Sequence, residues 1–400
     1  MRIVSDKNTK GIFIMSVLLA LFADIKCVNS VLVAFNPSFE GSLMSILYAG
    51  TVFLILFAGI KNNSIFGLSI KNLIIPIYCL TLYSFTILFG YEPRVSFLIF
   101  GVFTLSAYVM PLVIQIDTRI MLKATMFFSI FSLAKLSTIF AFAYDYNAAI
   151  SMGASYAYLV PVLATIVYDS YYLKFERGKQ RLVTIILSLC NLVFLFELVL
   201  FGSRGPLLAI AVFILLFYIV KPGYDHGAII KKSRLLVGSV LLFLLVIFFP
   251  SIVDILESLG IHSYSLTKII NMADEGTLSN GRDSLAEMAI SGFFEKPLFG
   301  HGLDLFGVRY EDASYPHNFI LQILYDGGII FFLILIIPGI RLIKNLFRNC
   351  SYNQLVFFLF IFSVSVPGAL FSGDLWESSL LWIMFGYLFN QNCVISKNEI

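Results

Sequence analysis

The residue best suited to chemistry is His317, in the run Pro316-His317-Asn318 at the start of a long apolar segment. Proline suits the first turn of a helix, so the pattern predicts that His317 lies among the unpaired N–H groups at the amino end of that helix. The positive end of a helix favours neutral imidazole, the form that accepts a proton from a hydroxyl. His317 is therefore either a general base or an interfacial histidine that only forms hydrogen bonds. Asn318 either orients a hydroxyl or caps backbone groups.

A first arginine of interest, Arg204, lies in the run Gly-Ser-Arg-Gly-Pro at residues 202–206, between two apolar segments. Because this connection is so short, Arg204 is expected at the outer edge of the membrane. It is there either an interfacial anchor or a two-pronged phosphate contact. Glu197 precedes it by two helical turns on the same face, and an acid at that depth is usually paired or functional. Arg204 is its most obvious partner.

A second arginine, Arg282, follows the turn signal Asn280-Gly281 and opens a helical pattern. The apolar residues of this pattern share one helical face: Leu285, Met288, Ala289 and Phe293. The pattern predicts an amphipathic helix on the outer leaflet or on the bundle. A cation is disfavoured at the amino end of a helix unless an anion is bound there. Arg282 is thus either a solvated charge or an anion contact.

Other ionisable residues give weaker signals. His301 lies between Gly300 and Gly302, which indicates a tight turn or a close approach of two backbone segments. His262 has no recognisable context. Two isolated groups in or beside apolar segments are expected to line a cavity: Lys135 and Asp374.

Patterns typical of metal sites are missing from the sequence. It has no Asp-x-Asp, no His-x-x-x-His and no closely spaced cysteine pair, and its five cysteines lie in or beside apolar runs. The first outer loop offers only Glu40, and the adjacent Glu311 and Asp312 are expected to form a solvated loop face. No metal or other cofactor is therefore expected.

The elements that position these residues are predicted by the composition. Hydrophobic residues make up 59% of the chain and charged residues 13%, whereas soluble domains average about 25% charged residues. A spanning helix needs about 20 apolar residues, and about twelve segments approach that length. They lie near 11–34, 42–60, 72–90, 95–114, 121–142, 153–172, 181–200, 205–220, 233–251, 318–340, 354–370 and 375–391. The sequence therefore predicts an all-α polytopic integral membrane protein with about 12 transmembrane helices.

One large polar stretch, from Ile252 to Tyr315, interrupts the apolar segments. This divides the chain into transmembrane helices one to nine (1–251), a loop with the amphipathic helix (252–316), and helices ten to twelve with a tail (317–400). Lys and Arg concentrate in alternate connections, which places both termini in the cytoplasm and the large loop outside. The net charge of +3 is too small to suggest nucleic acid as a partner.

Taken together and in this order, the motifs resemble the O-antigen polymerase and O-antigen ligase superfamily. The resemblance rests on the arginine turn at 202–205, the loop Arg282, the Pro-Leu-x-Gly-x-Gly stretch at 297–302, and Pro-His-Asn with Gly327-Gly328 downstream. It covers about residues 195–335. The first half of the chain resembles the family only in being apolar and rich in helices.

The resemblance implies a GT-C-like bundle with one large periplasmic loop, in the bacterial inner membrane. It implies metal-independent, inverting glycosyl transfer from undecaprenyl pyrophosphate at the periplasmic face. Arg204 and Arg282 would hold the pyrophosphate, and His317 would activate the acceptor hydroxyl. Asn318, Gly300 and Gly302 would shape the site. The implied partners are lipid-linked oligosaccharide donor and acceptor, membrane lipid and a chain-length regulator protein.

Two related activities and one unrelated activity fit these features. The run Ser-Leu-Ala-Glu at 284–287, after Arg282, lacks the aromatic residue that the ligase pattern often has, which favours a polymerase whose acceptor is a second lipid-linked repeat unit. The alternative is a ligase that transfers polymer to lipid A–core. A flippase for lipid-linked oligosaccharide is the third interpretation. It would need charged residues along a cavity within the helices, where this sequence has few.

Overall fold

The computed structural model describes residues 6–35, 42–61, 70–129, 204–222, 281–310, 314–371 and 373–390, with a few further positions at 131, 189, 228–230, 233, 236–238, 240, 255 and 258. These residues are almost entirely helical, as the composition predicts. The exception is a pair of short antiparallel strands, β1 (Val220–Pro222) and β2 (Ala228–Ile230), in which Val220 lies opposite Ile230.

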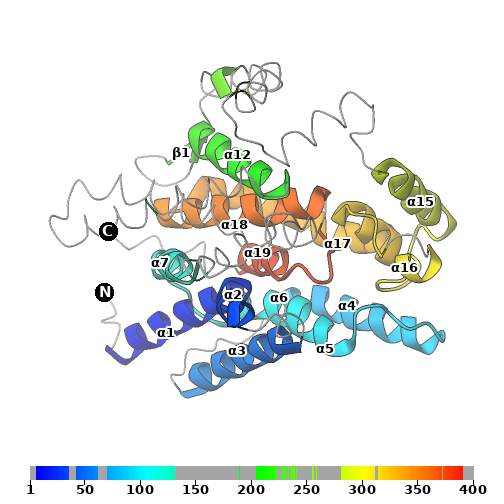
Figure 1. Ribbon diagram of the computed structural model, residues 1–400, viewed down its shortest axis with the longest axis horizontal. Helices are drawn as coiled ribbons and strands as arrows, with labels where there is room; N and C mark the ends of the chain where they lie inside the picture. The colour runs from blue at the N-terminus through cyan, green and yellow to red at the C-terminus, as the bar shows by residue number, and fades with distance from the viewer. Residues whose placement is uncertain are drawn as a thin grey trace.

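The first part of the chain forms one side of a helical bundle (Figure 1). Its elements are α1 (Asp6–Ala23), α2 (Ile25–Phe35), α3 (Ser42–Lys61), α4 (Ile70–Leu88), α5 (Phe97–Ile99), the π-helical η2 (Phe100–Ser106), α6 (Ala107–Val113) and α7 (Thr118–Ser129). The expected helix at 11–34 is thus two helices that meet at Asp24. The carboxylate of Asp117 accepts the N–H groups of Arg119 and Ile120 and so caps α7.

The second part of the chain forms the other side of the bundle and one of its two ends (Figure 1). Its elements are α12 (Arg204–Ile219), α15 (Arg282–Glu295), α16 (Phe306–Arg309), α17 (Phe319–Asn349), α18 (Tyr352–Phe371) and α19 (Ser379–Phe389). In Figure 1, α15 and α16 lie at the right-hand end of the bundle, and α1 starts at the opposite end.

Within the described part of the chain, three helices are long and apolar enough to cross a membrane: Met44–Lys61, Phe319–Asn349 and Gln354–Phe371. Several expected spans coincide with shorter apolar helices, which include Asn72–Leu88, Leu208–Ile219 and Ser379–Phe389. The expected span near 153–172, all of 181–200 except Leu189, most of 233–251 and the second half of 121–142 except Phe131 lie outside the described residues.

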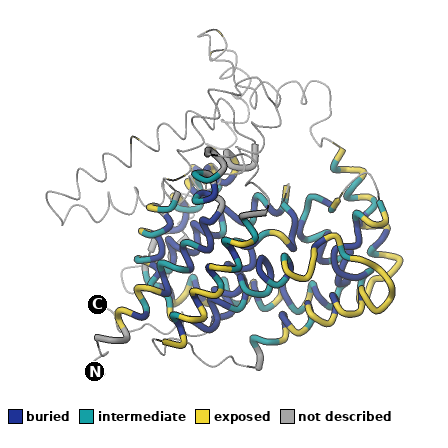
Figure 2. Tube along the Cα trace, turned by 60° about the horizontal axis from the view of Figure 1, so that its bottom comes forward, coloured by how far each residue is buried: buried dark blue, intermediate teal, exposed yellow. Residues whose placement is uncertain are grey.

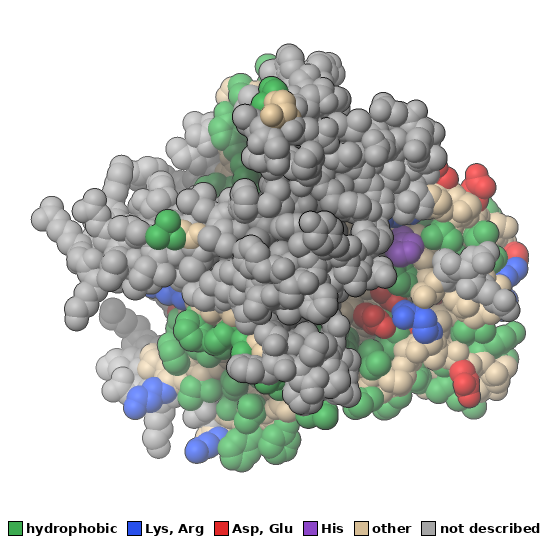
Figure 3. Space-filling view, viewed as in Figure 1, with side chains coloured by type: hydrophobic (Ala, Val, Ile, Leu, Met, Phe, Trp, Pro, Cys, Tyr) green, Lys and Arg blue, Asp and Glu red, His purple; other side chains and the backbone are tan. Residues whose placement is uncertain are grey.

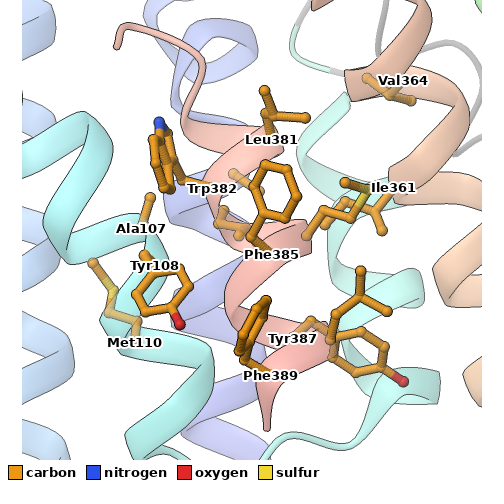
Figure 4. Close-up of a cluster of buried hydrophobic side chains, with 14 of the residues drawn as sticks. Ala107, Tyr108, Met110, Ile361, Val364, Leu381, Trp382, Phe385, Tyr387 and Phe389 are labelled. Atoms are coloured by element: carbon orange, nitrogen blue, oxygen red, sulfur yellow. The ribbon is translucent and has the colours of Figure 1, made fainter. Parts of the chain in front are cut away.

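The core is built where α6, α18 and α19 meet (Figure 4). The ring of Tyr108 on α6 lies edge-on to that of Trp382 on α19, with the ring centroids 6.2 Å apart. Gly386 makes this close packing possible, because a Cβ at that position would lie 2.2 Å from the carbonyl oxygen of Tyr108. Figure 2 shows buried residues gathered in the interior of the bundle and exposed residues along its outer sides.

The outward sides of α3 and α4 are apolar. Large hydrophobic side chains there are well exposed, among them Phe53 at 66% and Leu88 at 78%. Apolar surface of this extent would be costly in water, whereas hydrocarbon covers it favourably. Together with the long apolar helices, this surface is typical of a membrane protein.

The predicted amphipathic helix is α15, and it packs on the bundle, against α17. Ala289 and Gly292 are its buried residues, and the partly buried Leu285 and Met288 pack around Ala289, Phe306 and Tyr325. The apolar face that the sequence indicated is therefore the face that anchors α15. This contact places Arg282, the first residue of α15, at the end of the bundle where α16 also lies.

Candidate functional site

The framework of the site is a break in α17, which leaves helical geometry at Gly328 (φ 66°, ψ −168°). The loop at residues 297–302 lies against this break and exchanges four backbone hydrogen bonds with it. They run from His301 N to Tyr325 O (2.9 Å), Gly302 N to Asp326 O (3.0 Å), Ile329 N to Pro297 O (2.8 Å) and Ile330 N to Leu298 O (3.3 Å). Backbone groups that the break frees are thus satisfied by the loop.

Two glycines allow the loop and the helix to approach so closely. A Cβ on Gly300 would lie 2.3 Å from the carbonyl oxygen of Asp326, and a Cβ on Gly328 would lie 2.3 Å from the carbonyl oxygen of Leu298. Both glycines also have left-handed backbone angles, with φ values of 71° and 66°. The interpretation of Gly300 as a site of close backbone approach is therefore confirmed.

His317 precedes α17, which corrects the prediction that it lies in the first helical turn. The helix starts at Phe319, and Asn318 is the N-cap, because its Oδ1 accepts the N–H groups of Ile320 (2.9 Å) and Leu321 (3.2 Å). The capping interpretation of Asn318 is confirmed. His317 itself has a φ of 55°, a conformation that costs a non-glycine residue about 1–2 kcal/mol. Such strain persists only where the surroundings fix it, and it is frequent at functional sites.

Tyr315 connects His317 to the charged groups nearby. Its ring centroid lies 4.4 Å from that of His317, and the guanidinium of Arg94 lies 5.7 Å from the Tyr315 ring. Burial raises the pKa of Tyr315, the charge of Asp374 adds to this rise, and the positive charges of Arg94 and Arg282 oppose it. Arg282 and His317 therefore both lie in the neighbourhood of Tyr315.

For Arg204, the other arginine predicted to bind pyrophosphate, the structure describes the backbone but not the side chain. Helix α12 begins at Arg204, close to the predicted start at 205, but the residues before it and the Arg204 side chain lie outside the described part of the structure. Glu197, Lys135 and His262 also lie outside it.

His301 has a position between two helices. Its ring stacks on that of Tyr325 at 4.6 Å, and its Nε2 lies 2.8 Å from the carbonyl oxygen of Gly292 on α15. Burial chiefly lowers the pKa of His301, so the neutral form dominates at neutral pH. A carbonyl only accepts, so Nε2 carries the proton and donates it to Gly292. His301 thus joins α15 to α17.

Arg94, in the connection between α4 and α5, is a site residue that sequence reasoning missed, and Asp304 is another. Its guanidinium donates to Asp374 Oδ2 and to Glu377 Oε1 (3.3 Å), and its Nε lies 3.5 Å from Asp304 Oδ2. Asp374 was expected to be isolated, and this is wrong: besides Arg94, its Oδ1 accepts from Gln322 Nε2 at 3.0 Å. The available signal was an arginine in a short connection between apolar segments, the same setting as that of Arg204.

Asp304, the acid that lies 3.5 Å from Arg94 Nε, has a strongly shifted pKa. It is buried, and its Oδ2 accepts the backbone N–H of Val95 at 2.7 Å. Burial, with the negative charge of Asp374 nearby, raises its pKa to about 7, although Arg94 and the Val95 hydrogen bond act in the other direction. Asp304 is therefore partly protonated near neutral pH.

A cavity of about 590 Å³ opens beside the loop, between α4 and residues 296–302. Five of its twelve lining residues are aromatic, namely Tyr78, Phe85, Phe89, Tyr91 and Phe299, and Lys296 and His301 are among the polar ones. Figure 3 shows a histidine side chain exposed toward this end of the molecule, with basic and acidic side chains close by. In the part of the chain that the structure describes, no three His, Cys, Asp or Glu side chains are grouped to hold a metal ion.

Comparison with known proteins gives one finding. Residues 186–336 match the family model described as O-antigen ligase. No curated protein and no solved structure matches the chain. The matched region contains Arg204, Arg282 and His317, whereas Arg94 and Asp374 lie outside it. Over this region, which is less than half of the chain, the protein is similar to O-antigen ligases, and this supports the resemblance to the superfamily of O-antigen ligases and polymerases.

Proposed function

We propose that the protein is an O-antigen polymerase, which joins lipid-linked oligosaccharide repeat units at the periplasmic face of the bacterial inner membrane. The acceptor hydroxyl oxygen attacks the anomeric carbon of the donor sugar as the bond from that carbon to the pyrophosphate oxygen breaks. Undecaprenyl pyrophosphate leaves with the electron pair of that bond. Attack from the side opposite the leaving group inverts the anomeric configuration.

In this reaction, His317 takes the proton of the acceptor hydroxyl, and Arg282 and Arg204 neutralise the charge that develops on the departing pyrophosphate. Guanidinium groups suit this task because they stay charged and contact phosphate oxygens in a two-pronged manner. Charge stabilisation of this kind is often the largest contribution to catalysis. It requires no metal ion.

The observation that carries the proposal is the position of His317 and Arg282 around Tyr315, inside the region that matches the O-antigen ligase family. The left-handed backbone of His317 adds support, because strain of this kind is frequent at functional sites. The position of α15 at the end of the bundle opposite the start of α1 agrees with a site on the face away from a cytoplasmic N-terminus.

The second candidate is the ligase, which transfers finished polymer to lipid A–core, and the description of the matching family favours it. The two activities leave different lipopolysaccharides when they are lost. A cell without polymerase makes core that carries one repeat unit, whereas a cell without ligase makes bare core. A cell without flippase retains the lipid-linked unit on the cytoplasmic side. Deletion of the gene, with analysis of lipopolysaccharide and of the lipid-linked intermediates, therefore separates the three activities.

The role of His317 is tested best by His317→Asn. Asparagine tolerates the left-handed backbone, so this variant should fold, but its amide cannot take a proton from the acceptor. With purified protein and lipid-linked repeat units, we expect turnover to fall about 100-fold or more, within the usual contribution of a general base. Normal polymer from this variant would refute the base assignment.

Arg282 is tested by substitutions with glutamine and lysine. Removal of a cation from the amino end of α15 should leave the helix as stable as before or slightly more stable. Turnover should nevertheless fall in both variants, because lysine does not reproduce a two-pronged phosphate contact. Wild-type turnover in Arg282→Gln would exclude Arg282 from the pyrophosphate site.

A further inference from the structure

Arg94 links three connections at the outer end of the bundle. It lies between α4 and α5, it contacts Asp374 and Glu377 between α18 and α19, and it approaches Asp304 in the segment before α16. Asp304 and Asp374 are buried, whereas Glu377 is exposed. A single guanidinium thus holds segments that are distant in the sequence, and none of these contacts uses the residues assigned above to the reaction.

The contact with Asp374 extends into the first turn of α17. Asp374 Oδ1 accepts from the side-chain amide of Gln322 at 3.0 Å, and the other end of that amide accepts the N–H of Leu375 at 2.8 Å. Gln322 follows the N-cap by one turn, and its own N–H donates to the carbonyl of Asn318 at 2.9 Å. Arg94 is therefore connected through two buried side chains to the helix turn that follows His317.

The same guanidinium also reaches the segment before His317. It lies 5.7 Å from the centre of the Tyr315 ring, a distance typical of a cation–π contact. The Tyr315 ring in turn lies 4.4 Å from the His317 ring. Arg94 thus contacts Tyr315, which precedes His317 in the sequence, and is linked through Asp374 to Gln322, which follows it. The strained backbone of His317 lies between Tyr315 and Gln322 in the sequence.

We propose that Arg94 is a positioning residue for His317, which holds the segment from Tyr315 to Gln322 so that the imidazole keeps the orientation needed at the acceptor. The proposal rests on the role of His317 given above. It assigns Arg94 no contact with the substrate. Loss of Arg94 is therefore expected to slow the chemical step and to leave donor binding nearly unchanged.

The test is Arg94→Lys, measured in purified protein with lipid-linked repeat units. Lysine keeps the charge and can pair with one acid, but it cannot contact three carboxylates and lie flat over a ring. We expect kcat to fall about 10- to 100-fold, the range expected for a small misplacement of a reacting group, with the KM for the donor within about twofold of wild type. An unchanged kcat would overturn the proposal, and so would a loss confined to KM.

Two substitutions of Tyr315 test the same contacts, because the Tyr315 ring lies between Arg94 and His317 in this chain of contacts. Tyr315→Phe keeps an aromatic ring between Arg94 and His317 and should retain most of the turnover. Tyr315→Ala removes the ring and should reproduce the fall in kcat seen with Arg94→Lys. When both substitutions are combined, the loss should be smaller than the product of the two separate losses, because they interrupt the same connection. Equal activity of the two Tyr315 variants would contradict the proposal even if Arg94→Lys failed to fold.

The chain offers a matched control in Arg309. This arginine forms a two-pronged ion pair with Glu295, with N–O distances of 2.6 and 2.7 Å, and lies 5.5 Å from the ring of Tyr310. Arg309→Lys makes the same chemical change at an ion pair between α16 and α15, and it should leave kcat unchanged. His317→Asn, assayed alongside, separates the two proposals. If His317→Asn is fully active, the proposed role of His317 in the reaction fails. If His317→Asn is inactive but Arg94→Lys is fully active, only the positioning role of Arg94 is overturned.

Discussion

Gly300 and Asp326 approach each other so closely that a single carbon atom added to Gly300 would lie 2.3 Å from the Asp326 carbonyl oxygen. Gly302, two residues further along the loop, donates its N–H to that same carbonyl at 3.0 Å. The loop therefore takes the place of the helical partner that the break at Gly328 removes. These backbone hydrogen bonds hold the loop at residues 297–302 against α17, about three helical turns after His317. Because they join backbone atoms, the loop cannot shift without also moving α17.

The first prediction follows for Gly300→Ala. Alanine adds strain at a φ of 71° and a clash with backbone atoms, which together should lower the stability by about 2–5 kcal/mol. The control is Gly339→Ala, at a helical position where an added Cβ meets nothing within 4 Å. This control should be neutral or stabilise by up to about 1 kcal/mol. Thermal unfolding in detergent measures both, and equal melting temperatures for the two variants would contradict the prediction.

The parts of the fold that the sequence predicted correctly are those specified by local patterns. The apolar face of α15 follows from the spacing of Leu285, Met288 and Ala289, and the glycines at 300 and 302 indicated a close backbone approach. The start of α17 was less accurate, because Pro316 fits a first helical turn equally well. What decides the start is the side chain of Asn318, which caps the helix and leaves His317 outside it.

The break in α17 and the contacts of Arg94 were not predictable in the same way. The apolar run after Asn318 has the pattern of one continuous helix, and the break at Gly328 becomes favourable only when the loop supplies the missing hydrogen bonds. Arg94 and Asp374 are 280 residues apart, and no local pattern relates them. Two opposite charges at the outer ends of apolar segments indicate a common face, but their pairing depends on how the helices pack.

The second prediction concerns Asp304 and the pH dependence of stability. The charged groups that face it are Arg94, Asp374, Glu377 and Asp326. Burial chiefly raises its pKa from 3.8 to about 7, so the folded protein binds this proton more tightly than the unfolded chain does. The free energy of unfolding therefore contains a contribution from binding of this proton. That contribution is fully present below the pKa of Asp304 in the unfolded chain, and it is lost as the pH rises through the pKa of about 7 in the folded protein. The melting temperature should therefore fall between pH 6 and pH 8.

Asp304→Asn should remove this part of the pH dependence, because the amide has nearly the shape of the protonated carboxyl and does not ionise. Glu287→Gln, on the exposed side of α15, provides the control and should keep the wild-type slope. The measurement is the melting temperature in detergent at several pH values at constant ionic strength. A slope in Asp304→Asn as steep as that of wild type would show that another group titrates.

The third prediction separates the two described histidines. His301→Phe keeps a ring stacked on Tyr325 but loses the hydrogen bond to the Gly292 carbonyl, which should cost about 1 kcal/mol of stability. Turnover per folded molecule should stay near wild type, because the imidazole of His301 is used to join α15 to α17. His317→Asn should behave in the opposite way, with stability retained and turnover lost. If His301→Phe instead lost turnover at an unchanged melting temperature, His301 would belong to the reaction, and the cavity that it lines would become the acceptor site to test.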